Sequence, residues 1–264
     1  MSRNGLPALG FHAAFIAFML APLFAVCLVA FTPENYLSVP YDAFSTRWFR
    51  TLLHRPDFLR AAWLSVRLAA AASTLAIVVS VPASLVSARY RFAGQNVLGA
   101  LFMSPLTIPH VVLGIALLRY FIQIGIGASF AGLMIGHVLL VTPFALRLVL
   151  ASAAGVDERI RQAAISLGAG PFATLRRVTL PLILPGVVSG WMLAFIVSFD
   201  EVAMTVFLTA PGTDTLPLRM LNHIQETTDP LVAAVSALLI AGTALVALLL
   251  DRAFGLDRLL SGRG

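Results

Sequence analysis

Long apolar runs separated by short polar stretches dominate the chain. Runs free of Asp, Glu and Arg cover residues 6–31, 68–88, 92–118, 120–146, 178–199 and 231–250. A helix needs about 20 apolar residues to cross the hydrocarbon core of a bilayer, so each run is long enough to span a membrane. The pattern predicts an all-α, polytopic membrane protein with about six transmembrane helices. The glycine-rich stretch 124–129 is expected to join the third and fourth spans, and the fifth span is expected to continue past Asp200.

The composition supports this prediction and excludes one class of enzyme. Of the 264 residues, 59% are hydrophobic and only 11% are charged, against roughly 25% charged in a soluble domain. We therefore expect one transmembrane domain over residues 1–264. All 18 basic residues are Arg, with no Lys. Because the P-loop of an ATPase needs a Lys to reach the phosphates, this chain has no such site. If ATP drives it, the ATPase is another polypeptide.

The placement of the arginines predicts an orientation in the membrane. The net charge is +6, but the arginines flank apolar runs and form no single patch, which favours membrane topology over nucleic-acid binding. With six spans, 11 arginines lie on the side of both termini and 6 on the other side. Cytoplasmic segments carry the excess of basic residues, so both termini are expected to be cytoplasmic.

One polar insert is expected to fold outside the bilayer on the cytoplasmic side, with two short helices over about residues 156–180. Asp157 and Glu158 suit a helix start, and Gly168 suits a helix stop because it accepts a left-handed backbone. Pro171 suits the first turn of a second helix. An apolar face follows from the i, i+3, i+4, i+7 spacing of Ile160, Ala163, Ala164 and Leu167. The insert is either a docking element or an amphipathic loop resting on the membrane.

The same insert carries a family motif. Binding-protein-dependent ABC importer permeases have a cytoplasmic "EAA" motif: Glu-Ala-Ala, three residues, Gly, nine residues, Ile, one residue, Leu-Pro. The spacing is matched here by Gln162, Ala163, Ala164, Gly168, Val178, Leu180 and Pro181. Gln162 replaces the usual Glu, which removes a charge, and Val178 replaces Ile. The chain resembles this family along nearly its whole length. It most resembles the second permease subunit of spermidine/putrescine importers, as in residues 89–94, 198–202 and 216–218.

The resemblance implies a fold, partners and a mechanism. The fold would be that of a type I ABC importer permease in the bacterial inner membrane. A dimer of cytoplasmic ATPase subunits would bind ATP and Mg, so this chain would need no cofactor. A second permease subunit, a paralogue, would complete a path for alternating access, and a periplasmic binding protein would deliver a polyamine. Iron, an opine, aminoethylphosphonate or thiamine are alternative solutes. Membrane lipid is an expected partner and nucleic acid is not.

Two acids near the end of the fifth run are candidates for the solute path. Asp200 and Glu201 are the acids placed in a predicted span, and ionisable groups at membrane depth are functional candidates by default. Ser198 shares a helical face with Glu201, while Phe199 or Trp191 would give a cation–π wall for a cationic solute. The alternative is that both acids reach outer water or pair with an arginine. His110 is expected to be a hydrogen-bonded packing residue.

Two other classes of protein remain as rivals. A self-sufficient secondary transporter would carry an internal repeat and several mid-membrane charges, and the sequence has neither. An intramembrane enzyme would need a nucleophile with its base. No such arrangement and no metal-ligand spacing occur in the sequence, so we expect no catalytic and no metal site.

Overall fold

The computed structural model describes residues 5–39 and 43–254, and no β-strand occurs in those ranges. The chain forms two compact units. The central unit is Arg60–Arg219, and the terminal unit combines the described residues on either side of it. Three arginines that contribute to the predicted orientation, Arg3, Arg258 and Arg263, lie outside the described residues.

The terminal unit contains α1 (Leu6–Val29), α2 (Arg47–Leu53) and α12 (Leu231–Phe254). Both α1 and α2 pack against α12. Most of the large apolar side chains along α1, such as Phe11, Phe18 and Phe24, are exposed. Such a large exposed apolar surface is unfavourable in water and favourable in lipid, so this helix suits contact with lipid.

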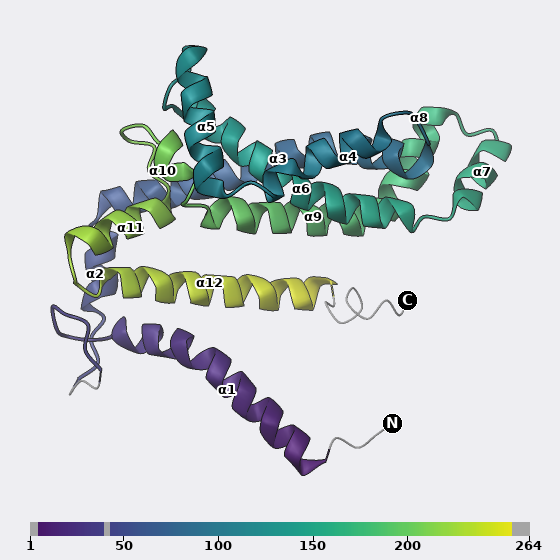
Figure 1. Cartoon of the computed structure of the whole chain (residues 1–264). Coiled ribbons are helices and arrows are strands. Elements are labelled where there is room, and N and C mark those ends of the chain that lie inside the picture. The colour runs from purple at the N-terminus through teal and green to yellow at the C-terminus, as the bar shows by residue number, and fades with distance from the viewer. Residues whose placement is uncertain (1–4, 40–42, 255–264) are drawn as a thin grey trace. The chain divides into compact units, whose positions relative to one another are not determined.

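The central unit is a bundle of long helices with a small helical element at one end (Figure 1). Its elements are α3 (Pro56–Arg89), α4 (Gln95–Met103), a 3₁₀ turn (Ser104–Leu106), α5 (His110–Gln123), α6 (Phe130–Ala154), α7 (Glu158–Ser166), α8 (Pro171–Thr174), a π turn (Leu175–Thr179), α9 (Leu180–Asp200) and α10 (Thr205–Leu208). α11 (Leu216–Glu226) continues from this unit into the terminal one.

Small residues bring α6 and α9 into close contact, and the two helices lie side by side (Figure 1). A Cβ atom added at Gly186 would lie 2.3 Å from Ser152 Cβ, and one at Gly190 would lie 3.1 Å from the Ala145 carbonyl oxygen. Helices in lipid associate through such small residues because the gain comes from van der Waals packing and not from burial away from water. This contact fixes the frame that holds the site residues.

Each predicted span overlaps helices of the structure, but the predicted third span is broken into two helices by a bend. Four helices are long and apolar enough to cross a membrane: Ala8–Val29, Pro56–Arg89, Phe130–Ala154 and Pro171–Asp200. The α4–α5 pair, bent by 103°, makes a fifth if it counts as one span, and α12 is apolar over Leu231–Leu245. The predicted connection is confirmed, since Gly125 and Gly127 have positive φ between α5 and α6.

Two predicted boundaries were wrong because the runs were cut at charged residues. The fourth span begins at Phe130, after the predicted connection, but it does not end at residue 146: it continues through Arg147, whose side chain is exposed, to Ala154. The second helix likewise starts at Pro56 and includes the exposed Arg67. An arginine can extend its charged end to water while its stem stays on the helix, so it need not end a helix.

Candidate functional site

The polar insert folds as two short helices joined by a tight turn. Asp157 caps α7, because its side chain accepts a hydrogen bond from the Arg159 amide at 2.8 Å. At the other end Gly168 has φ +87°. The Gly168 amide donates to the Ile165 carbonyl at 2.9 Å and the Ala169 amide donates to the Ala164 carbonyl at 3.0 Å. These two bonds form a Schellman motif, so the predicted helix start and stop are confirmed.

The second helix of the insert differs from its prediction. It was expected to be a short helix with Pro171 in its first turn, ending within the insert by about residue 180. The chain instead forms one continuous helix from Pro171 to Asp200, interrupted only by the π turn Leu175–Thr179. A π turn loosens the helical bonding just before Pro181, which lacks an amide hydrogen and could not continue regular bonding. The insert is therefore joined to a membrane helix through the π turn, with no loop between them.

The motif residues lie on α7, in the turn that closes it, in the π turn and at the start of α9. α7 packs against α8 and the π turn. Gln162, Ala163 and Gly168 are exposed, Ala164 and Val178 are half-buried, and Leu180 and Pro181 begin α9. Within the predicted apolar face Leu167 is 89% exposed, and Phe172 on α8 is 74% exposed. Two large apolar side chains beside an exposed Ala and Gly make a compact surface that another protein could contact closely. We define Gln162–Phe172 as the elbow.

The structure separates the two acids that the sequence places together. α9 ends at Asp200, and Glu201 has an extended backbone with ψ 122°, so the expectation that the helix continues past Asp200 was wrong. Asp200 is exposed, and it has no hydrogen bond or ion pair with any residue that the structure describes. Glu201 is buried. The acids therefore have different environments although they are neighbours in sequence.

Glu201 is held by two partners inside the bundle. One carboxylate oxygen, Oε2, lies 2.8 Å from His110 Nδ1, and the other, Oε1, accepts the Met204 amide at 2.6 Å. His110 begins α5, directly after the bend that follows α4. Glu201 thus connects the end of α9 to the start of α5 and caps the turn that leads into α10. His110 is hydrogen-bonded, as the sequence predicted.

A second buried polar group continues this connection. His137 on α6 lies between two hydroxyls, with Nδ1 2.8 Å from Ser198 Oγ and Nε2 3.1 Å from Thr205 Oγ1. The Thr205 hydroxyl also donates to the Glu201 carbonyl at 3.0 Å. Ser198 therefore faces α6 and does not lie with Asp200. His137 was missed in the sequence because a single His in an apolar run has no neighbouring polar residue to reveal its partners.

Aromatic rings form a stripe along α9. Trp191 and Phe195 stack at 5.4 Å between ring centroids, and Phe195 and Phe199 stack at 6.1 Å. The Trp191 indole donates to Thr74 Oγ1 at 3.0 Å, which orients the ring against α3. Trp191 and Phe199 were candidates from sequence, whereas Phe195 was missed, although i, i+4, i+8 spacing alone indicates it. All three rings are half-buried, so an aromatic face beside Asp200 remains accessible to a cation.

Among residues 5–39 and 43–254, no three His, Cys, Asp or Glu side chains gather as ligands of a metal ion would. What defines the molecule is a bundle of membrane-length helices, one of them bent, with a rigid helical elbow between α6 and α9. These features define the class of a polytopic membrane protein with a helical element outside its long helices.

Comparison with known proteins gives the family. The model of the binding-protein-dependent transport system inner membrane component matches residues 80–256, and the chain belongs to this family. It is 30% identical over 231 residues to the spermidine/putrescine transport system permease protein PotC of Escherichia coli K12, covering 88% of this chain and 87% of PotC. It is 38% identical over 247 residues to the molybdenum transport system permease protein ModB of Mycobacterium bovis, covering 84% and 91%.

The fold is also found in a solved structure. A chain from a bacterial ABC transporter involved in the import of the acidic polysaccharide alginate matches with a TM-score of 0.73 at 15% identity. The match covers 96% of this chain and 99% of that one. The family match, together with the membrane-length apolar helices, makes the protein a multi-pass permease subunit of the inner membrane. Its family acts together with ATPase and substrate-binding subunits.

Proposed function

We propose that this chain forms half of the translocation path of an ABC importer for a polyamine of the spermidine/putrescine class. A second permease subunit, a paralogue, forms the other half, and a periplasmic binding protein delivers the solute. A separate ATPase dimer binds ATP and Mg, so this chain needs no cofactor. The termini and the elbow lie in the cytoplasm, as the arginine distribution favours. The observation that carries the proposal is the exposed elbow fixed to the rigid Pro171–Asp200 helix.

The elbow is the proposed contact with the ATPase. Leu167 and Phe172 project from it, and Ala163 and Gly168 leave space beside them. An ATPase groove that receives the elbow would move α8 and α9 as one body, because the helix is continuous from Pro171. Gln162 supports this contact by hydrogen bonds in place of the ion pair that a Glu would make. Alternating access follows when two such elbows are drawn together and the helices tilt.

Gly168→Ala is expected to uncouple the elbow. An added Cβ would meet no atom within 4 Å, so the substitution creates no clash. The φ of +87° is unfavourable for alanine, by roughly 1–2 kcal/mol. The backbone relieves this strain by changing the angle between α7 and α8. ATP-driven uptake in proteoliposomes is therefore expected to fall by at least about fivefold. Gly155→Ala is the matched control, because Gly155 also ends a helix but has φ −81°. Equal uptake by both variants would contradict the coupling role.

The solute is proposed to be a cation because Asp200 is exposed and unpaired beside the aromatic stripe. In the complex reconstituted with its partners, Asp200→Asn is expected to raise the KM for spermidine about fivefold. The reason is the loss of about 1 kcal/mol of attraction at a wetted site. Asp214→Asn, an acid in the loop before α11, is the control. An unchanged KM for Asp200→Asn would remove Asp200 from the path.

The similarity to ModB makes a molybdenum compound the second candidate solute. Uptake of each radiolabelled solute in turn, added outside the same proteoliposomes, distinguishes the two candidates. Uptake of spermidine or putrescine that excess molybdate does not inhibit supports the polyamine. Uptake of molybdate alone would overturn the polyamine assignment and leave the importer class intact.

A further inference from the structure

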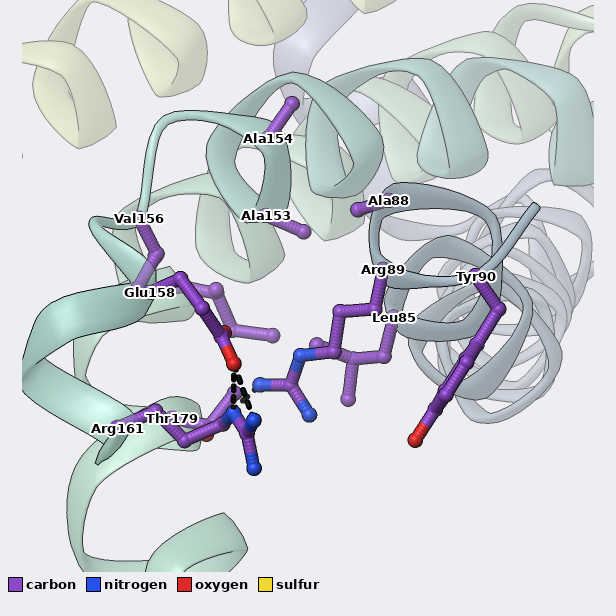
Figure 2. Close-up of a pocket in the computed structure, with 11 residues that line it drawn as sticks. Leu85, Ala88, Arg89, Tyr90, Ala153, Ala154, Val156, Glu158, Arg161 and Thr179 are labelled. Carbon is purple, nitrogen blue, oxygen red and sulfur yellow. Dashed lines mark hydrogen bonds and ion pairs between the residues drawn. The ribbon is translucent and has the colours of Figure 1, made fainter. Parts of the chain in front are cut away.

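A cavity of about 360 Å³ lies where α3 and α6 end and α7 begins (Figure 2). Arg89 and Tyr90 line it from the end of α3, and Glu158 and Arg161 line it from α7. Thr179 closes it from the π turn that leads into α9. Leu85 and Ile183 give the cavity an apolar side. All of these residues belong to the central unit.

Arg89 supplies unused hydrogen-bond donors to the cavity. Its Nη2 donates to Thr179 Oγ1 at 2.9 Å, and Arg89 forms no ion pair with any residue that the structure describes. A guanidinium has five N–H donors in a fixed planar arrangement, so most of them remain available. Figure 2 shows the Arg89 side chain extending across the cavity toward Glu158 and Arg161. The cavity therefore has a cation without a direct ion pair among the described residues, and Glu158 acts on it only at longer range.

The second arginine of the cavity is only partly neutralised. Nε of Arg161 donates to Oε1 of Glu158, and Nη2 forms an ion pair with the same oxygen. The hydrogen bond from Arg161 lowers the pKa of Glu158 below its usual value. Glu158 is therefore ionised at neutral pH and takes up the charge of one arginine. Two arginines face one carboxylate, so the cavity keeps a net charge of +1. The planar N–H donors of a guanidinium match the oxygens of a phosphate group well.

The cavity is framed by the ends of membrane-length helices. α3 ends at Arg89, α6 ends at Ala154 and α9 begins at Leu180, and the ends of spanning helices lie where lipid headgroups lie. Basic pockets between such helix ends bind anionic headgroups, with the acyl chains following the apolar side. We propose that this cavity binds the phosphodiester headgroup of an anionic phospholipid, held by Arg89 and Arg161 with the Tyr90 and Thr179 hydroxyls beside them.

A bound headgroup would connect the end of α3 to α7 through a single ligand. The elbow would then be positioned by lipid as well as by its own helix. The binding site stands on its own observations and does not rest on the proposed solute or on contact with an ATPase. A lipid-binding measurement can fail while transport succeeds, and the reverse also holds.

The test uses the full-length chain, purified in detergent and stripped of lipid. It is titrated with short-chain phosphatidylglycerol and with phosphatidylcholine of the same acyl chains, with bound lipid counted by native mass spectrometry. The expected result is that phosphatidylglycerol binds about tenfold more tightly. Arg89→Gln is expected to remove this preference. Glu158→Gln is expected to strengthen phosphatidylglycerol binding severalfold, because it frees Arg161 for the phosphate.

Arg91→Gln is the matched control, since Arg91 is exposed two residues further along and does not line the cavity. It is expected to bind phosphatidylglycerol as the unchanged chain does. Equal binding of both lipids, or an Arg89→Gln variant that still prefers phosphatidylglycerol, would overturn the proposal. Inorganic phosphate is the third arm of the titration. If phosphate at similar concentration displaces phosphatidylglycerol in an Arg89-dependent way, the site takes free phosphate and the lipid assignment is wrong.

Discussion

Replacing Gly186 with valine is expected to force α6 and α9 apart and to prevent the central unit from packing. A Cβ at this position would lie 2.3 Å from Ser152 Cβ and 2.8 Å from the Leu148 carbonyl oxygen. The second of these atoms belongs to the backbone, so a side-chain rotation cannot relieve the clash. Overpacking of this kind costs about 3 kcal/mol or more. Thermal unfolding in detergent measures the loss, together with the yield of monodisperse protein.

Two further variants identify the cause of that loss. Gly186→Ala is expected to be destabilised less than valine, and adding Ser152→Gly is expected to restore part of the stability, because it removes two of the three clashing atoms. Gly242→Ala on α12 is the control, since a Cβ there would meet nothing within 4 Å. If Gly186→Val unfolds at the same temperature as the unchanged chain, the close approach of α6 and α9 is not what holds this unit together.

Glu201→Ala is expected to destabilise the bend between α4 and α5. The substitution leaves His110 Nδ1 and the Met204 amide without the carboxylate that now binds both. A buried polar group without a partner costs about 1–3 kcal/mol, which applies to the buried Met204 amide, whereas His110 is partly exposed and can be hydrated in part. Glu201→Gln is expected to lose less, because an amide keeps the length and can still accept the Met204 amide. Thermal unfolding and protease sensitivity of the stretch 104–110 report the effect.

The neighbouring acid supplies the control for this prediction. Asp200→Ala removes an exposed side chain without a partner among the described residues, so stability is expected to stay unchanged. The two adjacent acids would then differ in kind, with Glu201 affecting folding and Asp200 affecting transport. Equal stability of Glu201→Ala and Asp200→Ala would show that the contact with His110 contributes nothing.

The sequence was sufficient to predict those features that depend on contacts between residues close together in the chain. The cap at Asp157 and the stop at Gly168 follow from chemistry within a few residues, and the structure has both. The glycine-rich connection before Phe130 is of the same kind. Hydrophobic length located every long helix, because crossing lipid constrains length and composition more than any partner does.

Contacts between distant residues could not be predicted in this way. Nothing near His110 in the sequence indicates Glu201, which lies 91 positions away. The burial of Ser198 depends in the same way on His137. The end of α9 at Asp200 was also missed, because a helix stop made by a buried carboxylate and a returning amide has no Gly or Pro signal. Cutting apolar runs at arginines failed because an arginine can remain in a helix while its charge reaches water.

The helix from Pro171 to Asp200, continuous except for the π turn Leu175–Thr179, has a mechanical consequence. At 1.5 Å per residue its 30 residues make a rod about 45 Å long. A small tilt of this helix at Pro171 produces a larger displacement at its other end, next to the Glu201 carboxylate that binds His110. The π turn, with its looser bonding, is the natural place for such a rod to flex. The stiffness of the π turn would therefore determine how much of a movement at the elbow is transmitted along the helix to the far side of the membrane.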